Sequence, residues 1–192
     1  MPLPALFDVD RFIADCRARL ADHSPQTGIR ELVARVVSQP VQLLRALGEP
    51  ARGGIQKLYQ SNELTVLNVI WAPNMTLMPH DHRMWAVIGV YTGREDNIFW
   101  RRIASEPRGK IEAAGAKSLS AADALPLGHD IIHSVTNPLR RLTGALHVYG
   151  GDFFGVDRSE WDAETLREQR FDIQKTLQLF EESNARPQAG QS

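Results

Sequence analysis

Hydrophobic positions recur every three or four residues along the first quarter of the chain, which is the period of an amphipathic helix. Residues 8–23 follow this period, with an aspartate at the start that can cap a helix. A second helical stretch begins near Thr27, is interrupted at Pro40 and then resumes. We therefore expect a helical prefix over residues 1–55.

Beyond residue 55 the pattern changes to short runs rich in Val, Ile, Leu, Trp and Thr, separated by Gly, Pro and Asn about every ten residues. No helical pattern separates these runs, so a sandwich or barrel is favoured over a parallel sheet. We expect this β core over residues 56–156. The expected strands cover residues 64–71, 80–91, 97–103, 111–119, 131–136 and 143–149.

Helical spacing returns near the C-terminus, where Leu166, Phe171 and Phe180 belong to one apolar side. We expect a helical segment over residues 157–184 and a flexible polar tail over 185–192. A chain of 192 residues is long enough for one well-filled core and short for two. The prediction is a single, mainly β domain over residues 1–192, with N-terminal helices and a C-terminal helix.

The composition of the chain excludes some classes of function and favours others. Lys plus Arg (22) and Asp plus Glu (23) nearly cancel, so no global field favours nucleic acid or an anionic membrane. Cys16 is the single cysteine, which excludes an intramolecular disulfide and fits a reducing compartment. No export signal or membrane-spanning run is recognisable. We expect a cytoplasmic protein with a small-molecule partner, and its sheet edges and apolar helices favour a homodimer.

Three histidines form the main candidate for chemistry. His80 and His82 are two residues apart in an expected strand, so both imidazoles point to one face. His133 lies in a later apolar run, and three imidazoles leave positions on a metal ion open for a ligand. His129 is a competing third ligand, but it follows the turn residue Gly128, which favours an exposed position. We predict a divalent metal bound by His80, His82 and His133.

The region of residues 64–154 resembles the cupin superfamily, whose two motifs supply a His-X-His pair and a later histidine followed by an asparagine. His80, His82, His133 and Asn137 match these elements. The resemblance implies a double-stranded β-helix, the jelly-roll form of the sandwich. The glutamate usual in the first motif is missing, because residues 83–90 contain no acidic residue.

Loss of that glutamate with retention of three histidines is similar to the cysteine dioxygenase family, and most similar to its bacterial branch. The residues from Leu146 to Tyr149 resemble that family's His-X-Tyr element, although the family's serine falls on Ala145. The family resemblance implies an Fe(II) enzyme that oxidises a small thiol, cysteine or a mercapto acid, to a sulfinate with dioxygen. It also implies catalytic roles for Tyr149 and His147.

Members of that family hold the substrate carboxylate with an arginine or a glutamine on an early strand, which implies this role for Gln60. Glutamine cannot grip a carboxylate in two places as arginine does, so Gln60 argues against cysteine itself as substrate. Arg83 is an alternative if its side chain turns inward. Glu95 lies in the polar stretch 93–97, where its side chain could reach the site, but we expect a solvated hairpin end.

Two other functions stay open at this point. Three histidines plus water also suit zinc or another divalent metal, as in a cupin isomerase or hydrolase. A non-catalytic cupin that binds a small ligand is the remaining alternative.

Overall fold

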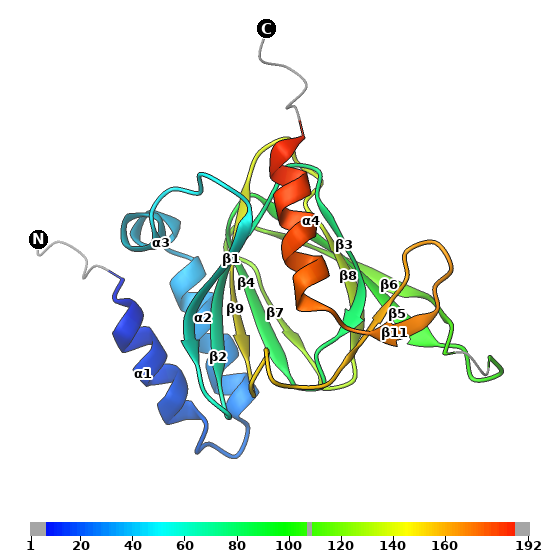
Figure 1. Cartoon of the computed structure of the whole chain (residues 1–192). Coiled ribbons are helices and arrows are strands. Elements are labelled where there is room, and N and C mark those ends of the chain that lie inside the picture. The colour runs from blue at the N-terminus through cyan, green and yellow to red at the C-terminus, as the bar shows by residue number, and fades with distance from the viewer. Residues whose placement is uncertain (1–6, 107–108, 187–192) are drawn as a thin grey trace, which may run out of the picture.

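Two antiparallel sheets form the centre of the structure, a computed structural model that describes residues 7–106 and 109–186 (Figure 1). One sheet has the strand order β1-β2-β9-β4-β7 and the other β11-β10-β3-β8-β5-β6. The strands are β1 (Gly54–Gln60), β2 (Thr65–Trp71), β3 (Thr76–Asp81), β4 (Ala86–Thr92), β5 (Arg94–Arg102), β6 (Ile111–Ser120), β7 (Ala124–Leu127), β8 (Ile132–Thr136), β9 (Thr143–Tyr149), β10 (Ser159–Trp161) and β11 (Glu168–Arg170).

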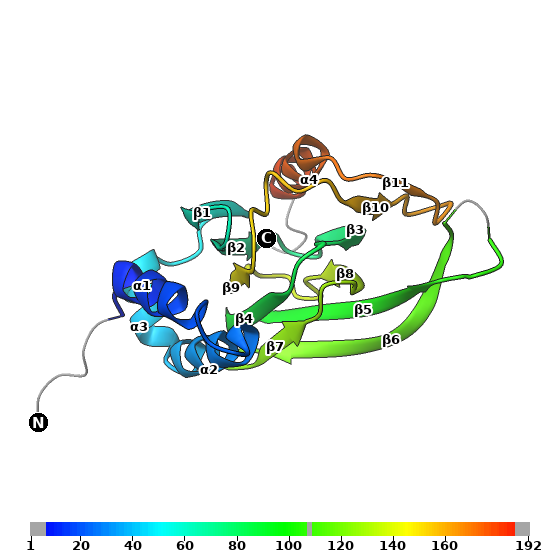
Figure 2. The ribbon, with the colours of Figure 1, turned by 90° about the horizontal axis from the view of Figure 1, so that it is seen from below.

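Three N-terminal helices cover the outer face of the five-stranded sheet, on the side away from β3 and β8 (Figure 2). They are α1 (Val9–Arg19), α2 (Pro25–Val37) and α3 (Pro40–Leu47). The Asp8 side chain caps α1 by accepting a hydrogen bond of 3.0 Å from the backbone N–H of Arg11. A Cβ on Gly89 would overlap the side chain of Val33, so α2 approaches β4 at a distance that glycine permits. The predicted N-terminal helices are thus present, although residues 1–6 of the expected prefix lie outside the described residues and β1 already begins at Gly54.

Strand β9 shows how the interior is divided. All seven of its residues are buried, because its two faces meet two different apolar layers. Leu146 and Val148 pack against the helices, whereas Ala145 and Tyr149 face the space between the sheets. The alternation therefore also places His147 in the interior between the sheets.

The single expected strand over residues 80–91 is wrong. β3 ends at Asp81 in one sheet, and β4 begins at Ala86 in the other. Between them Arg83 adopts a φ of +53°, a left-handed conformation that turns the chain from one sheet to the other. A run of apolar residues does not mark such a crossing, because strands of both sheets have the same composition.

The expected helix over residues 157–184 is wrong in its first part, which forms β10 and β11. Glu160 pairs in register with His80, so β10 extends the sheet beside β3. The helix α4 (Ile173–Ala185) starts only where Asp172 caps it by accepting from the backbone N–H of Gln174. The expected tail begins at Ala185, the last residue of α4, and residues 187–192 lie outside the described residues.

α4 lies on the far side of the five-stranded sheet from the other helices (Figure 1). Its Phe180 stacks on Trp71 with ring centroids 5.5 Å apart, and this contact closes the interior on that side. The predicted fold class, a mainly β double-stranded sandwich with helices at both ends, is confirmed. No helix in the described part of the chain has the length and apolar character that a membrane crossing requires.

Candidate metal centre

Three imidazoles meet between the sheets. His80 lies on β3 directly opposite His133 on β8, and His82 follows just beyond the end of β3. The Nε2 atom of His82 is 3.2 Å from Nε2 of His80 and 3.3 Å from Nε2 of His133. A divalent ion about 2.0–2.1 Å from each nitrogen would hold nitrogen pairs roughly 3.0–3.4 Å apart. The spacing therefore fits one shared ion.

Hydrogen bonds fix which nitrogen of two of these rings carries the proton. Nδ1 of His80 is 3.0 Å from the carbonyl oxygen of Met78, and Nδ1 of His133 is 2.7 Å from Oδ1 of Asn97. Both oxygens only accept, so both Nδ1 atoms donate and both Nε2 atoms present lone pairs to the centre. A proton on Nε2 of His82 could form a hydrogen bond to only one of these two lone pairs. A cation at the centre can bind Nε2 of all three rings.

Burial keeps the three rings uncharged. It lowers the pKa of His80 to about 3, with the nearby Arg158 guanidinium adding to the effect. It also lowers the pKa of His82 and of His133 well below the usual value, and the neighbouring imidazoles contribute. Neutral imidazole is the form that binds a metal ion, so the site is prepared for one at neutral pH.

The three histidines border a cavity of about 30 Å³, more than the roughly 10–15 Å³ that one water molecule requires. Most of its wall is apolar, and α4 contributes Phe180 and Thr176. Two polar atoms in the wall, Nε2 of His147 and Oγ1 of Thr176, have no hydrogen-bond partner among residues 7–106 and 109–186. The space accepts a very small ligand as it stands, and a larger one requires side chains to move.

Tyr149 and His147 lie beside the imidazoles, as the family resemblance implies. The Tyr149 hydroxyl is 3.0 Å from Nδ1 of His147. The Tyr149 ring also meets the His82 ring edge to face, with centroids 5.0 Å apart. Burial raises the pKa of Tyr149 above its usual value, with Arg158 opposing and Glu95 adding to this shift. The phenol is therefore neutral, and the catalytic roles of these two residues stay predictions.

The structure does not bring Gln60 or Arg83 to the cavity. Gln60 is exposed at the end of β1, where its amide donates a hydrogen bond of 2.7 Å to Asp152. Arg83 points outward from the turn after β3 and forms an ion pair of 2.9 Å with Asp81. A substrate contact by either residue would require a different side-chain position.

Arg158 is a site residue that sequence reasoning missed. It is buried just before β10, with its guanidinium carbon 3.6 Å from the ring centroid of Phe171 and 4.1 Å from that of Phe153. One terminal nitrogen, Nη1, donates to the carbonyl oxygen of Asp81 at 3.0 Å, while Nη2 has no partner in the described chain. Burial lowers the pKa of Arg158 to about 10, so the group is still charged at neutral pH.

The two rings that enclose Arg158 separate an inner space from an outer one. Phe153 and Phe171 line the small cavity, and they also line a surface pocket of about 490 Å³ that includes Arg158. Arg158 therefore lies between solvent and the histidines. Its sequence context, a polar stretch between two elements, carries no signal of burial.

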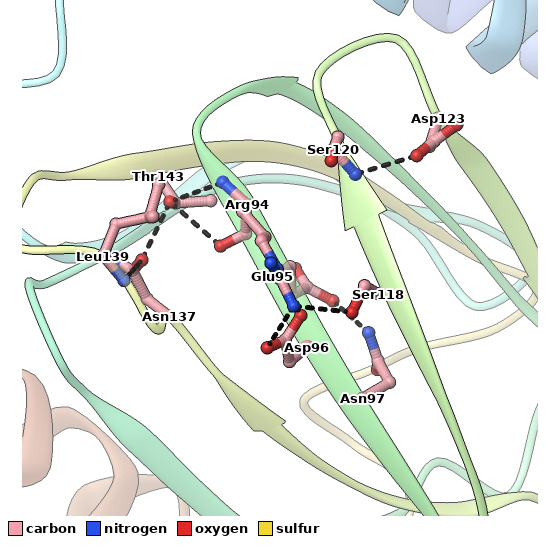
Figure 3. Close-up of polar contacts among 10 residues, drawn as sticks. All are labelled: Arg94, Glu95, Asp96, Asn97, Ser118, Ser120, Asp123, Asn137, Leu139 and Thr143. Atoms are coloured by element: carbon pink, nitrogen blue, oxygen red, sulfur yellow. Dashed lines mark hydrogen bonds and ion pairs between the residues drawn. The ribbon is translucent and has the colours of Figure 1, made fainter.

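The expectation that Glu95 belongs to a solvated hairpin end is wrong. Alternation along β5 turns Glu95 and Asn97 inward, whereas Arg94 and Asp96 pair with each other on the outside (Figure 3). Glu95 is completely buried, and its carboxylate accepts hydrogen bonds from Nε1 of Trp71 at 2.9 Å and Nδ2 of Asn97 at 3.0 Å. An acidic residue is thus connected to His133 through Asn97.

A search against protein-family models found no match to this chain. Similar solved structures include an RmlC-like cupin with a double-stranded β-helix fold from Methanocaldococcus jannaschii, with a TM-score of 0.46 and 6% identity over 56% of this chain and 87% of that one. Another is a double-stranded β-helix protein from Klebsiella pneumoniae, with a TM-score of 0.42 and 12% identity over 57% of this chain and 82% of that one.

The same search found oxalate decarboxylase from Bacillus subtilis, with a TM-score of 0.42 and 15% identity. The match covers 56% of this chain but only 28% of the decarboxylase chain. These similarities concern the fold and leave the reaction open.

Proposed function

We propose that this protein is a mononuclear non-haem iron enzyme that oxidises a small mercapto acid to the sulfinate. In this reaction one thiol and one dioxygen molecule give one sulfinic acid, so that both oxygen atoms end on sulfur. The supporting observation is the ligand set: three neutral, buried imidazoles with no carboxylate among them. We place this reaction in the cytoplasm, because a free, buried cysteine such as Cys16 is typical of proteins in a reducing compartment.

The charge of the ligand set explains the preference for a thiol. Three neutral imidazoles leave the charge of a divalent ion uncompensated, so the site favours an anionic thiolate. Ferrous iron would supply the redox chemistry that joins a bound thiolate to dioxygen. The protein contributes the apolar wall, which excludes water, and a phenol at Tyr149 that can form a hydrogen bond to the ligand.

Arg158 is the group best suited to hold the substrate carboxylate. It is charged, its Nη2 atom has no hydrogen-bond partner among the described residues, and it stands between the surface pocket and the cavity. A carboxylate on Nη2 would gain a charge-assisted hydrogen bond in a dry environment. A thiol that carries a carboxylate a few bonds away would then place its sulfur toward the histidines. We take this role to belong to Arg158 rather than to Gln60 or Arg83.

Entry of such a substrate requires movement, because the cavity has room for only about two or three water molecules. Phe153 and Phe171 form the partition, and a displacement of either would join the surface pocket to the cavity. A substrate anion on Arg158 can offset the lost contacts between the guanidinium and these rings. The two phenylalanines therefore control access in this proposal.

The test is dioxygen uptake by protein reconstituted anaerobically with Fe²⁺ and offered 3-mercaptopropionate, cysteine or cysteamine. Mass spectrometry then detects the sulfinate. We expect turnover of 3-mercaptopropionate and little or none of cysteamine, which lacks a carboxylate for Arg158. Bound iron without uptake for any thiol would refute the proposal. A protein purified with zinc, and inactive with iron, would favour Lewis-acid chemistry instead.

A further inference from the structure

Glu95 holds a central position among the buried polar groups that surround the metal centre. Its Oε1 accepts from Asn97, whose Oδ1 in turn accepts from Nδ1 of His133 (Figure 3 shows the first contact). Its Oε2 accepts from Trp71 and lies 3.6 Å from Nε2 of His147. The Glu95 carboxylate is thus linked through Asn97 to His133, a candidate metal ligand, and it also lies beside the His147–Tyr149 pair.

A completely buried carboxylate requires compensation. Trp71 and Asn97 supply neutral N–H donors, and neither brings a positive charge. Arg94, its neighbour in sequence, is turned away and bound to Asp96 and Ser118. In the described part of the chain, the one side chain that can bear a positive charge and is recorded in contact with Glu95 is His147.

The two ring nitrogens of His147 lie in different environments. Nδ1 lies 3.0 Å from the Tyr149 hydroxyl, whereas Nε2 is buried without a hydrogen-bond partner in the described chain. The 3.6 Å to Glu95 is an ion-pair distance and slightly too long for a hydrogen bond. A buried N–H is most stable when directed at an anionic acceptor, and a bare lone pair there would face the carboxylate unfavourably. The proton therefore belongs on Nε2.

We propose that Glu95 is a positioning residue that holds the His147 proton on Nε2, so that Nδ1 accepts the hydroxyl proton of Tyr149. This inference rests on the proposed function for its chemical consequence, and on the contacts of Glu95 and His147 for its geometry. The arrangement follows the logic of a carboxylate–histidine–hydroxyl triad, in which a buried carboxylate sets the tautomer of the imidazole.

The consequence concerns the direction of proton movement. Because the Tyr149 hydroxyl donates its hydrogen bond to His147, the oxygen lone pairs of Tyr149 face the cavity. A ligand in the cavity can then donate a hydrogen bond to this oxygen. A thiol can then lose its proton to Tyr149 while the Tyr149 proton passes to Nδ1 of His147. The thiol becomes a thiolate, Tyr149 is again neutral, and His147 becomes an imidazolium whose charge Glu95 balances. Glu95, His147 and Tyr149 would thus form a route by which the site deprotonates its substrate.

The experiment reads the tautomer directly. The full-length protein, labelled with ¹⁵N at histidine and loaded with diamagnetic Zn²⁺, is examined by NMR, because protonated and unprotonated ring nitrogens resonate in separate ranges. A His147→Gln sample identifies the His147 signals by their loss. We expect a protonated Nε2 and an unprotonated Nδ1 in the wild-type protein. An unprotonated Nε2 would overturn the proposal.

A variant then tests whether Glu95 is the cause. In Glu95→Gln the amide group must turn an N–H toward one of the groups that donate to the carboxylate, so we expect the His147 nitrogen signals to shift. Asp96→Asn makes the same chemical change on the outer face of β5 and should leave them in place. Unchanged His147 signals in a folded Glu95→Gln protein would remove Glu95 from the role.

These readouts are independent of turnover. If the wild-type protein shows the expected tautomer but oxidises no thiol, the proposed function fails and the assignment of Glu95 stands. If Glu95→Gln does not fold, the wild-type spectrum still tests the tautomer, and an unprotonated Nε2 still overturns the proposal. With active enzyme, Glu95→Gln should lower kcat by at least tenfold while KM for 3-mercaptopropionate changes little, because Arg158 still holds the carboxylate.

Discussion

His80 on β3 pairs in register with His133 on β8, and an oxygen acceptor holds Nδ1 of each ring. The antiparallel ladder therefore sets the separation of the two ligands, and the hydrogen bonds set their tautomers. His82 completes the cluster from a position just past the end of β3. Strand register thus sets the relative position of His80 and His133 in the candidate metal site.

Removal of one imidazole should abolish tight metal binding. We expect the wild-type protein to retain one equivalent of metal after dialysis and His82→Ala, which leaves two nitrogens, to lose it. Elemental analysis gives the metal content. His129→Ala, which removes an exposed histidine paired with Asp130, is the matched control and should keep a full equivalent. Retention of one equivalent by His82→Ala would contradict the assignment.

Loss of the Tyr149 hydroxyl should slow the reaction without emptying the site. We expect Tyr149→Phe to lower kcat by about 10²–10⁴, the range for removal of a group that transfers a proton. Metal content should not change, because the hydroxyl is no part of the ligand set. Tyr91→Phe also removes a buried hydroxyl, one bonded to Asn68 away from the cavity, and should keep the wild-type rate. Equal rates for both variants and wild type would exclude Tyr149 from the mechanism.

Substitution of Arg158 should weaken binding of carboxylated thiols. Arg158→Lys keeps the charge but loses the planar group between Phe153 and Phe171, and with it the Nη2 donor that we assign to the carboxylate. We expect KM for 3-mercaptopropionate to rise roughly 10- to 100-fold, which corresponds to a lost charged hydrogen bond of about 1.5–3 kcal/mol. Arg170→Lys changes an exposed arginine of the same surface pocket and serves as the control. An unchanged KM in Arg158→Lys would point to another carboxylate partner.

The metal-free protein should lose stability as the pH falls. The pKa of His80 is about 3 in the folded state against an ordinary value of 6.5, and those of His82 and His133 are also lowered. Between these values the unfolded chain binds more protons than the folded one, so stability increases with pH. The contribution of each histidine is at most about 1.4 kcal/mol per pH unit between pH 6.5 and the folded-state pKa.

Urea unfolding of metal-free protein at several pH values between 5 and 7.5 measures this dependence. His80→Gln removes one of the titrating groups and should reduce the slope of unfolding free energy against pH. His129→Gln lies at an exposed position and should not. A slope in His80→Gln equal to that of the wild-type protein would show that His80 is already protonated in the folded state or does not titrate differently on unfolding.

Much of the fold follows from local pattern. The apolar period of three to four residues predicts α1 and α2, and the short apolar run over 143–149 predicts β9, because both signals depend on neighbours in the chain. The spacing of His80 and His82, together with a later histidine in an apolar run, was enough to group the three residues that meet between the sheets.

Other features depend on what packs against a residue from elsewhere in the fold. The break at Arg83 exists because β3 and β4 belong to different sheets, and β10 is a strand because β3 offers it an edge. Glu95 and Arg158 are charged residues in polar stretches, and only contacts with Trp71, Asn97, Phe153 and Phe171 make them buried. The sequence by itself determined the strand character and the three histidines of the candidate metal site. The tertiary structure decided which charged groups surround them, because burial of a charge depends on partners that are distant in the chain.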